Sequence, residues 1–76
     1  MMSNITAKVV HNELMRMCNE LMHEYDCAAQ HNNVMQQNKV VAQLIAMQTL
    51  AGRLEDRSVE LVVVAFINRN LHGVAA

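Results

Sequence analysis

The chain has no proline, no tryptophan and only two glycines among its 76 residues. Proline and glycine supply most of the turn chemistry that a protein of many short strands needs. Their scarcity therefore favours a few long helices joined by short connections. Aromatic residues make up 3% of the chain, whereas methionine occurs seven times. We expect a core of flexible aliphatic side chains, which specify one packing arrangement only weakly.

Charged residues of either sign are also few, and their distribution does not indicate a strongly charged partner such as nucleic acid. Charged residues make up 17% of the chain, and the formal net charge is −1. The basic residues are scattered among acids, so no positive strip suited to a phosphate backbone is visible. They are Lys8, Arg16, Lys39, Arg53, Arg57 and Arg69. Two cysteines, Cys18 and Cys27, are too few to cross-link a secreted mini-domain.

Long hydrophobic runs are missing too. The longest, 61–67, is far shorter than the roughly 20 residues that a membrane span requires, and the first residues lack the apolar core of a signal peptide. Yet hydrophobic residues form 53% of the chain, which is too many for a disordered polymer. We therefore expect a single helical domain over residues 1–76, reduced and located in the cytoplasm.

Hydrophobic periodicity predicts three helices in each chain. Apolar side chains recur every three or four residues over about 4–30, 34–54 and 58–72, as they do on one face of an α-helix. The β-branched run 62–64 would also suit a buried strand. No second strand is available to pair with it, so a third helix is favoured.

Asparagines and a charged segment mark the connections between these helices. Asn32 and Asn33 suit a tight turn, because asparagine tolerates a left-handed backbone at the end of one helix and caps the start of the next. A single bent helix through this point is the alternative. Gly52 lies at the second break, after which Asp56 or Ser58 can cap the third helix.

The third helix is hydrophobic on two sides, which is more than one short chain can bury. We expect its wider stripe to join subunits, so that three-helix chains assemble as a homodimer or higher oligomer into an all-α helical bundle. This predicted oligomer interface consists of Val59, Val62, Val63 and Phe66. The narrower side, with Val64 and Leu71, is expected to pack within the chain because Asn68 interrupts it.

A second contact surface, for a protein partner, is predicted on the first helix. It consists of Met15, Cys18, Met22 and Tyr25. These side chains lie on or beside the apolar stripe of an amphipathic helix, opposite a face of charged and amide side chains. The pattern is typical of a protein that acts by protein–protein interaction.

No catalytic or nucleotide-binding motif is present. His23, Cys27 and His31 have ligand chemistry suited to zinc, but on a straight helix their spacing prevents all three from reaching one ion. His23 and Cys27 also lack the orienting third group and the oxyanion-stabilising groups of a nucleophilic enzyme. The sequence therefore predicts a non-enzymatic protein without a metal or other cofactor, and leaves the role of these three residues open.

A nucleic-acid-associated regulator is the alternative function. Its basic patch would form only on assembly, from Arg53, Arg57 and Arg69 of the gathered chains. A helix-turn-helix around Gly52 is disfavoured, because the helix that follows is too apolar to lie in a major groove. Nucleic acid is therefore the less favoured partner.

Residues 11–33, HNELMRMCNELMHEYDCAAQHNN, form a short stretch rich in methionine and asparagine. This stretch resembles the small helical accessory proteins of lambdoid phages and prophages. The resemblance covers the first predicted helix and its turn. It implies a non-enzymatic protein that binds a host or phage regulator.

Overall fold

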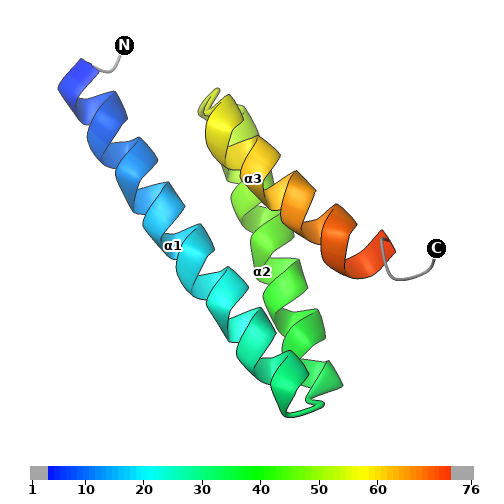
Figure 1. The fold of residues 1–76 in the computed structure, drawn as a ribbon. Helices are drawn as coiled ribbons and strands as arrows, with labels where there is room; N and C mark the ends of the chain where they lie inside the picture. Colours follow the sequence, from blue (N-terminus) through cyan, green and yellow to red (C-terminus); the bar gives the residue numbers. More distant parts are fainter. Residues whose placement is uncertain (1–3, 73–76) are drawn as a thin grey trace.

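A computed structural model describes residues 4–72 of the chain (Figure 1). The chain forms α1 (Asn4–Gln30), α2 (Val34–Arg53) and α3 (Arg57–Ile67), and a π-helical turn, η1 (Asn68–His72), continues α3. No strand occurs among these residues. The predicted all-α chain of three helices is therefore confirmed.

The end of the third helix differs most from the expectation. Regular α-helical bonding stops at Ile67, and the chain widens into the π-helical turn instead of continuing as α-helix to about residue 72. At this point Asn70 donates from Nδ2 to the carbonyl oxygen of Phe66 at 2.9 Å. The side chain of Asn70 thus donates to a backbone carbonyl at the point where the backbone hydrogen bonding changes from the α-helical to the π-helical pattern.

Two asparagines make the turn between α1 and α2. Asn32 has a left-handed backbone with φ 55°. Asn33 caps α2, because its side chain accepts a hydrogen bond from the backbone nitrogen of Gln36 at 3.1 Å. Its own backbone nitrogen donates to the carbonyl of Ala28 at 2.9 Å and closes the end of α1. The two-asparagine turn is confirmed, and a single bent helix is excluded.

The second turn is built around an acidic pair. Asp56 caps α3, because its Oδ1 accepts from the backbone nitrogen of Val59 at 3.3 Å, as the sequence predicted. The left-handed position is Glu55, with φ 59°. Gly52 lies inside the last turn of α2 without a positive φ. The break therefore falls after Arg53, and glutamate rather than glycine takes the strained backbone conformation.

Glu55→Gly is expected to raise the free energy of unfolding by about 0.5–1 kcal/mol, since glycine adopts a left-handed backbone without the steric cost that glutamate pays. Asn32→Gly is the matched control, because asparagine already tolerates this conformation and its replacement should change stability by only a few tenths of a kcal/mol. Urea unfolding followed by circular dichroism measures both. A larger gain at Asn32 than at Glu55 would contradict this explanation.

The core lies between the α1–α2 hairpin and α3. Its largest fully buried side chains are Cys18, Val40, Leu44, Val59 and Val63. Tyr25 of α1 and Phe66 of α3 meet edge to face, with ring centroids 5.3 Å apart and planes at 85°. α3 packs mainly on α2 and makes fewer contacts with α1, and Figure 1 shows its C-terminal end leaning away from α1. One aromatic pair thus links the first helix to the third.

The predicted oligomer interface needs correction. Val59, Val63 and Phe66 are 0%, 0% and 4% exposed and belong to the chain's own core, while Val62 is half-buried. The other side of α3 is the open one, with Leu61 exposed and Val64 half-buried. The wider stripe offers more apolar area, so burying it against the hairpin is the larger gain for a single chain.

The partner surface predicted on α1 needs the same correction. Cys18 is fully buried and Tyr25 is 6% exposed, so both are core residues. Met15 and Met22 are half-buried and pack against that core. The surface consists of the inner side of α1 and its margin, and its two central residues are unavailable to a partner in the folded chain.

The molecule is flat and elongated. Its Cα atoms span 43 × 23 × 13 Å, and their radius of gyration is 13.5 Å, against about 11 Å for a compact domain of this length. Its accessible surface is 5488 Å², roughly 800 Å² more than expected for a compact monomer of its mass. A thin arrangement of helices leaves apolar side chains at the surface.

Candidate functional site

Large hydrophobic side chains remain exposed on all three helices and on η1. Those in the described part of the chain are Ile5, Val9, Met17, Val34, Met35, Ile45, Leu50, Leu54, Leu61 and Leu71. Single exposed apolar residues are normal on soluble domains, whereas grouped ones mark contact surfaces. Exposed apolar residues that lie together are therefore the candidates for a contact surface.

One of them, Met17, lines a groove between α1 and α2. We call it the open groove, because no residue of α3 contributes to its lining. It has a volume of about 320 Å³ and is lined by Met17, Glu20, Leu21, Glu24, Gln43, Ala46 and Met47. Leu50 lies one turn beyond Ala46 on the same side of α2 and is 43% exposed, so it extends the apolar strip. α3 covers the other side of the hairpin.

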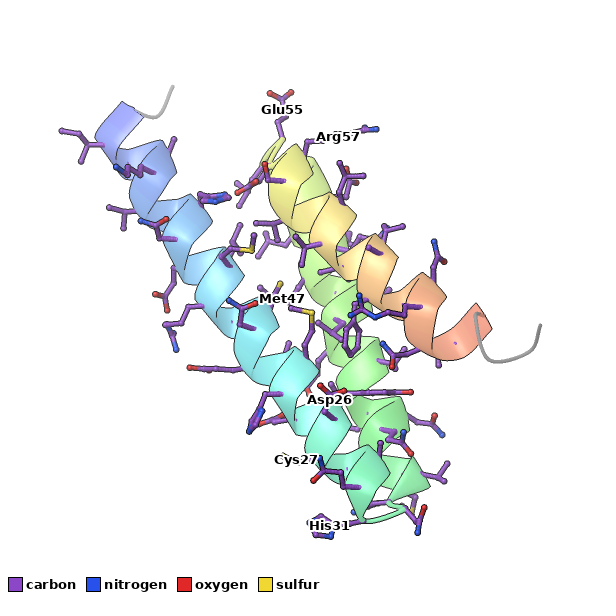
Figure 2. All side chains as sticks on the ribbon, viewed as in Figure 1. Asp26, Cys27, His31, Met47, Glu55 and Arg57 are labelled. Atoms are coloured by element: carbon purple, nitrogen blue, oxygen red, sulfur yellow. The ribbon has the colours of Figure 1, made fainter. Side chains whose placement is uncertain are left out.

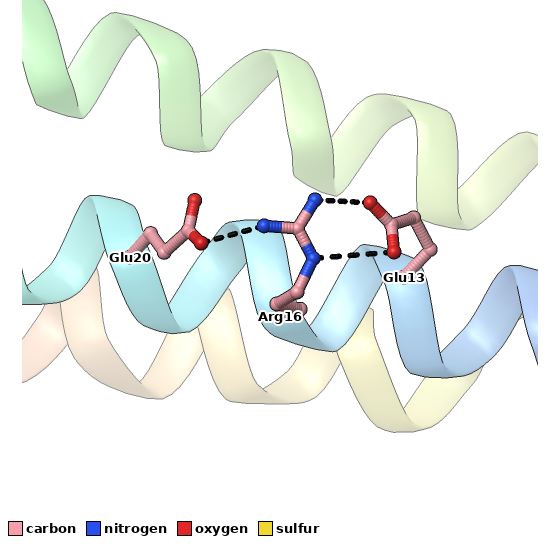
Figure 3. Close-up of polar contacts among 3 residues, drawn as sticks. All are labelled: Glu13, Arg16 and Glu20. Carbon is pink, nitrogen blue, oxygen red and sulfur yellow. Dashed lines mark hydrogen bonds and ion pairs between the residues drawn. The ribbon is translucent and has the colours of Figure 1, made fainter.

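The α1 edge of the open groove is acidic. Arg16 donates to Glu20 at 2.5 Å and forms a two-pronged ion pair with Glu13, and Figure 3 shows the three side chains in one row along α1. The hydrogen bonds from Arg16 lower the pKa of Glu13. Two carboxylates share this one guanidinium, and Glu24 adds a further negative charge at the groove. The edge therefore carries net negative charge.

The α2 edge is basic. Lys39 lies one turn before Gln43, and Arg53 lies one turn after Leu50, so helical spacing places both beside the groove. Both side chains are exposed. The open groove thus has an apolar floor between a negative edge on α1 and a positive edge on α2.

A second cavity, of about 380 Å³, lies where the first part of α1 meets the α2–α3 turn. It is lined by Ala7, Lys8, Val10, His11, Leu54, Glu55 and Asp56. In its wall, Nδ1 of His11 lies 2.7 Å from Oδ2 of Asp56, while the other carboxylate oxygen caps α3. The polar groups of this cavity therefore hold α1 to the turn, which is a structural role.

The residues considered for metal binding separate into a pair and a single histidine. Sγ of Cys27 lies 3.6 Å from Nε2 of His23 on α1. His31 lies beyond α1 in the turn, and Figure 2 shows it at the end of the hairpin. Within residues 4–72, histidine, cysteine and acidic side chains form no group of three that could hold an ion.

The other cysteine is part of the core. Cys18 is fully buried, and burial raises the pKa of its thiol, with a further contribution from the charge of Asp56. A buried thiol with a raised pKa is a poor nucleophile at neutral pH. Cys27 is therefore the accessible thiol of the two.

The three arginines of the alternative function are not gathered within one chain. Arg53 ends α2 and Arg57 begins α3, but Glu55 and Asp56 lie between them. Arg69 lies at the far end of α3, in η1, where its guanidinium carbon is 5.7 Å from the ring centroid of Phe66. A nucleic-acid surface would have to be assembled from several chains.

No helix in the part of the chain that the structure describes has the length and apolarity needed to cross a membrane.

The chain matches no protein-family model, no curated protein and no solved structure.

Proposed function

We propose that this chain is a non-catalytic, homo-oligomeric helical protein of the cytoplasm that acts through protein–protein interaction. The observation that carries the proposal is the open groove, whose apolar floor no part of α3 covers. The resemblance of residues 11–33 to accessory proteins of lambdoid phages and prophages supports a regulatory or accessory role. The basic unit of assembly in this proposal is a homodimer.

The charges at the groove edges favour a second copy of the chain as its occupant. A two-fold axis parallel to the helices stacks two hairpins face to face, with α1 of each chain over α2 of the other. The acidic edge then faces the basic edge on both sides of the dimer, with Lys39 near the level of the partner's Glu24 and Arg53 near the level of its Glu13. Such complementarity selects the partner and its orientation, and the apolar floor supplies the affinity.

The surface area supports the same assembly. The chain exposes 5488 Å², and its excess over a compact monomer of this mass is roughly 800 Å². Each partner of a stable protein complex of standard size buries about 800 Å². Self-association through the groove would therefore bring the exposed surface of each chain close to that of a compact monomer of the same mass.

Light scattering after gel filtration tests the proposal. We expect the wild-type protein, at low micromolar concentration, to have twice the monomer mass of 8.6 kDa. Leu50→Asp should be monomeric while keeping its helical circular dichroism, because an interfacial charge is unpaired in the dimer and solvated in the monomer. Leu50 is already 43% exposed in the single chain, so the fold does not depend on it.

Leu61→Asp is the matched control. Leu61 is 51% exposed and lies on α3, outside the open groove, so this variant should keep the wild-type mass. A monomeric wild-type protein would overturn the proposed assembly. A dimer that Leu61→Asp dissociates and Leu50→Asp leaves intact would place the contact on α3 instead.

A further inference from the structure

His23 and Cys27 lie one helical turn apart near the end of α1, and the distance between Nε2 and Sγ is 3.6 Å. Zinc binds histidine nitrogen at about 2.0–2.1 Å and cysteine sulfur at about 2.3 Å. At a tetrahedral angle these bond lengths place two neighbouring nitrogen and sulfur ligands about 3.6 Å apart. The two donor atoms therefore already have the separation that a shared zinc ion requires.

The surroundings favour a cation. Glu20 and Glu24 lie three residues before His23 and Cys27, which places one carboxylate on the neighbouring turn for each member of the pair. Arg16, the nearest base along α1, is engaged by Glu13 and Glu20. His23 is exposed and Cys27 is half-buried. An ion held by both would thus be reachable from solvent and would lie in a field of net negative charge.

We propose that His23 and Cys27 form a two-residue binding site for a thiophilic transition-metal ion, with Zn²⁺ as the ion and water at its two remaining positions. Binding releases the thiol proton of Cys27 to solvent and leaves the thiolate and a neutral imidazole as ligands. His31 takes no part, since within residues 4–72 no three histidine, cysteine or acidic side chains are grouped closely enough to hold an ion. Neither ligand itself lines the open groove, but Glu20 and Glu24 also form its acidic edge, so the metal site and the proposed self-association share these two carboxylates.

Protection of Cys27 from alkylation tests the site. In the folded protein, N-ethylmaleimide should modify Cys27 and leave the buried Cys18 unmodified, as mass spectrometry of the digested protein can show. Excess Zn²⁺ should slow modification of Cys27 roughly tenfold or more, because a metal-bound thiolate is no longer a free nucleophile. Mg²⁺ prefers oxygen ligands and should give no protection.

Two histidine variants decide whether the pair acts together. His23→Ala should lose most of the zinc protection, while His31→Ala should keep it. Both positions are exposed, so unchanged circular dichroism is expected for each. Co²⁺ gives a second readout, since a cobalt–thiolate absorption band should form in the wild-type protein and be absent from Cys27→Ser. Absence of protection in the wild type, or equal protection in His23→Ala, would overturn the proposed site.

Discussion

Phe66→Ala is expected to lower the free energy of unfolding by about 3–5 kcal/mol, which is most of the stability of a domain this small. Phe66 is 4% exposed, and its ring meets that of Tyr25 edge to face. Truncation leaves a cavity in an aliphatic core and removes the one aromatic contact between α1 and α3. Urea unfolding followed by circular dichroism measures the loss.

Leu61→Ala is the control on the same helix. Leu61 is 51% exposed, so its truncation should change stability by less than about 0.5 kcal/mol. The pair also separates two interpretations of α3. A Phe66→Ala protein that unfolds like the wild type but has a smaller mass would restore the wider stripe of α3 as the subunit contact.

Asp56→Ala is expected to cost about 2 kcal/mol, the sum of a lost helix cap and a lost partly buried hydrogen bond of about 1 kcal/mol each. One carboxylate oxygen accepts from the backbone of Val59, and the other lies 2.7 Å from Nδ1 of His11. The aspartate is largely buried, with 15% of its side chain exposed. Chemical unfolding measures the change in stability.

Two companion variants separate the roles of Asp56. Asp56→Asn keeps a side-chain oxygen that can cap α3 but loses the charge opposite His11, so it should cost less than Asp56→Ala. The cost of Asp56→Ala should also shrink in a His11→Ala background, because the shared bond is already gone. Equal costs for Asp56→Ala in both backgrounds would show that His11 adds nothing to the turn.

Local sequence signals predicted the turns of this fold. Asn32 and Asn33 divide the left-handed position and the helix cap between them, and Asp56 caps α3. Each of these features depends on side-chain and backbone chemistry within three or four residues. Such chemistry can be interpreted without knowing where the rest of the chain lies. Glu55 was not foreseen, since nothing in its side chain favours a left-handed backbone.

The direction that α3 faces could not be predicted in the same way. Both of its sides are apolar, and periodicity alone does not say which one meets the α1–α2 hairpin. The interruption at Asn68 suggested that the narrower side was internal, but Asn68 is exposed where the helix widens into η1. The buried side is the one with Val63 and Phe66, since it removes more apolar surface from water.

The open groove was also missed, although a signal for it existed. The apolar arc of α2 exceeds half of its circumference and includes Leu50, which is wider than contact with one neighbouring helix requires. On α1, the predicted partner surface consists of Met15, Cys18, Met22 and Tyr25, but Cys18 and Tyr25 are buried in the chain's own core. Another molecule can therefore contact only the margin of the apolar stripe of α1, where Met17 lies.

The contacts between helices that are neighbours in sequence affect how the chain folds. Each helix packs mainly on the helix next to it in sequence, and the fewest helix–helix contacts join the two that are far apart in sequence, α1 and α3. Such low contact order is associated with folding in microseconds to milliseconds. A three-residue turn tethers α3 to α2 and gives it an effective concentration in about the millimolar range. α3 therefore occupies its side of the hairpin before a second chain at micromolar concentration can compete for it, and association is directed to the opposite side.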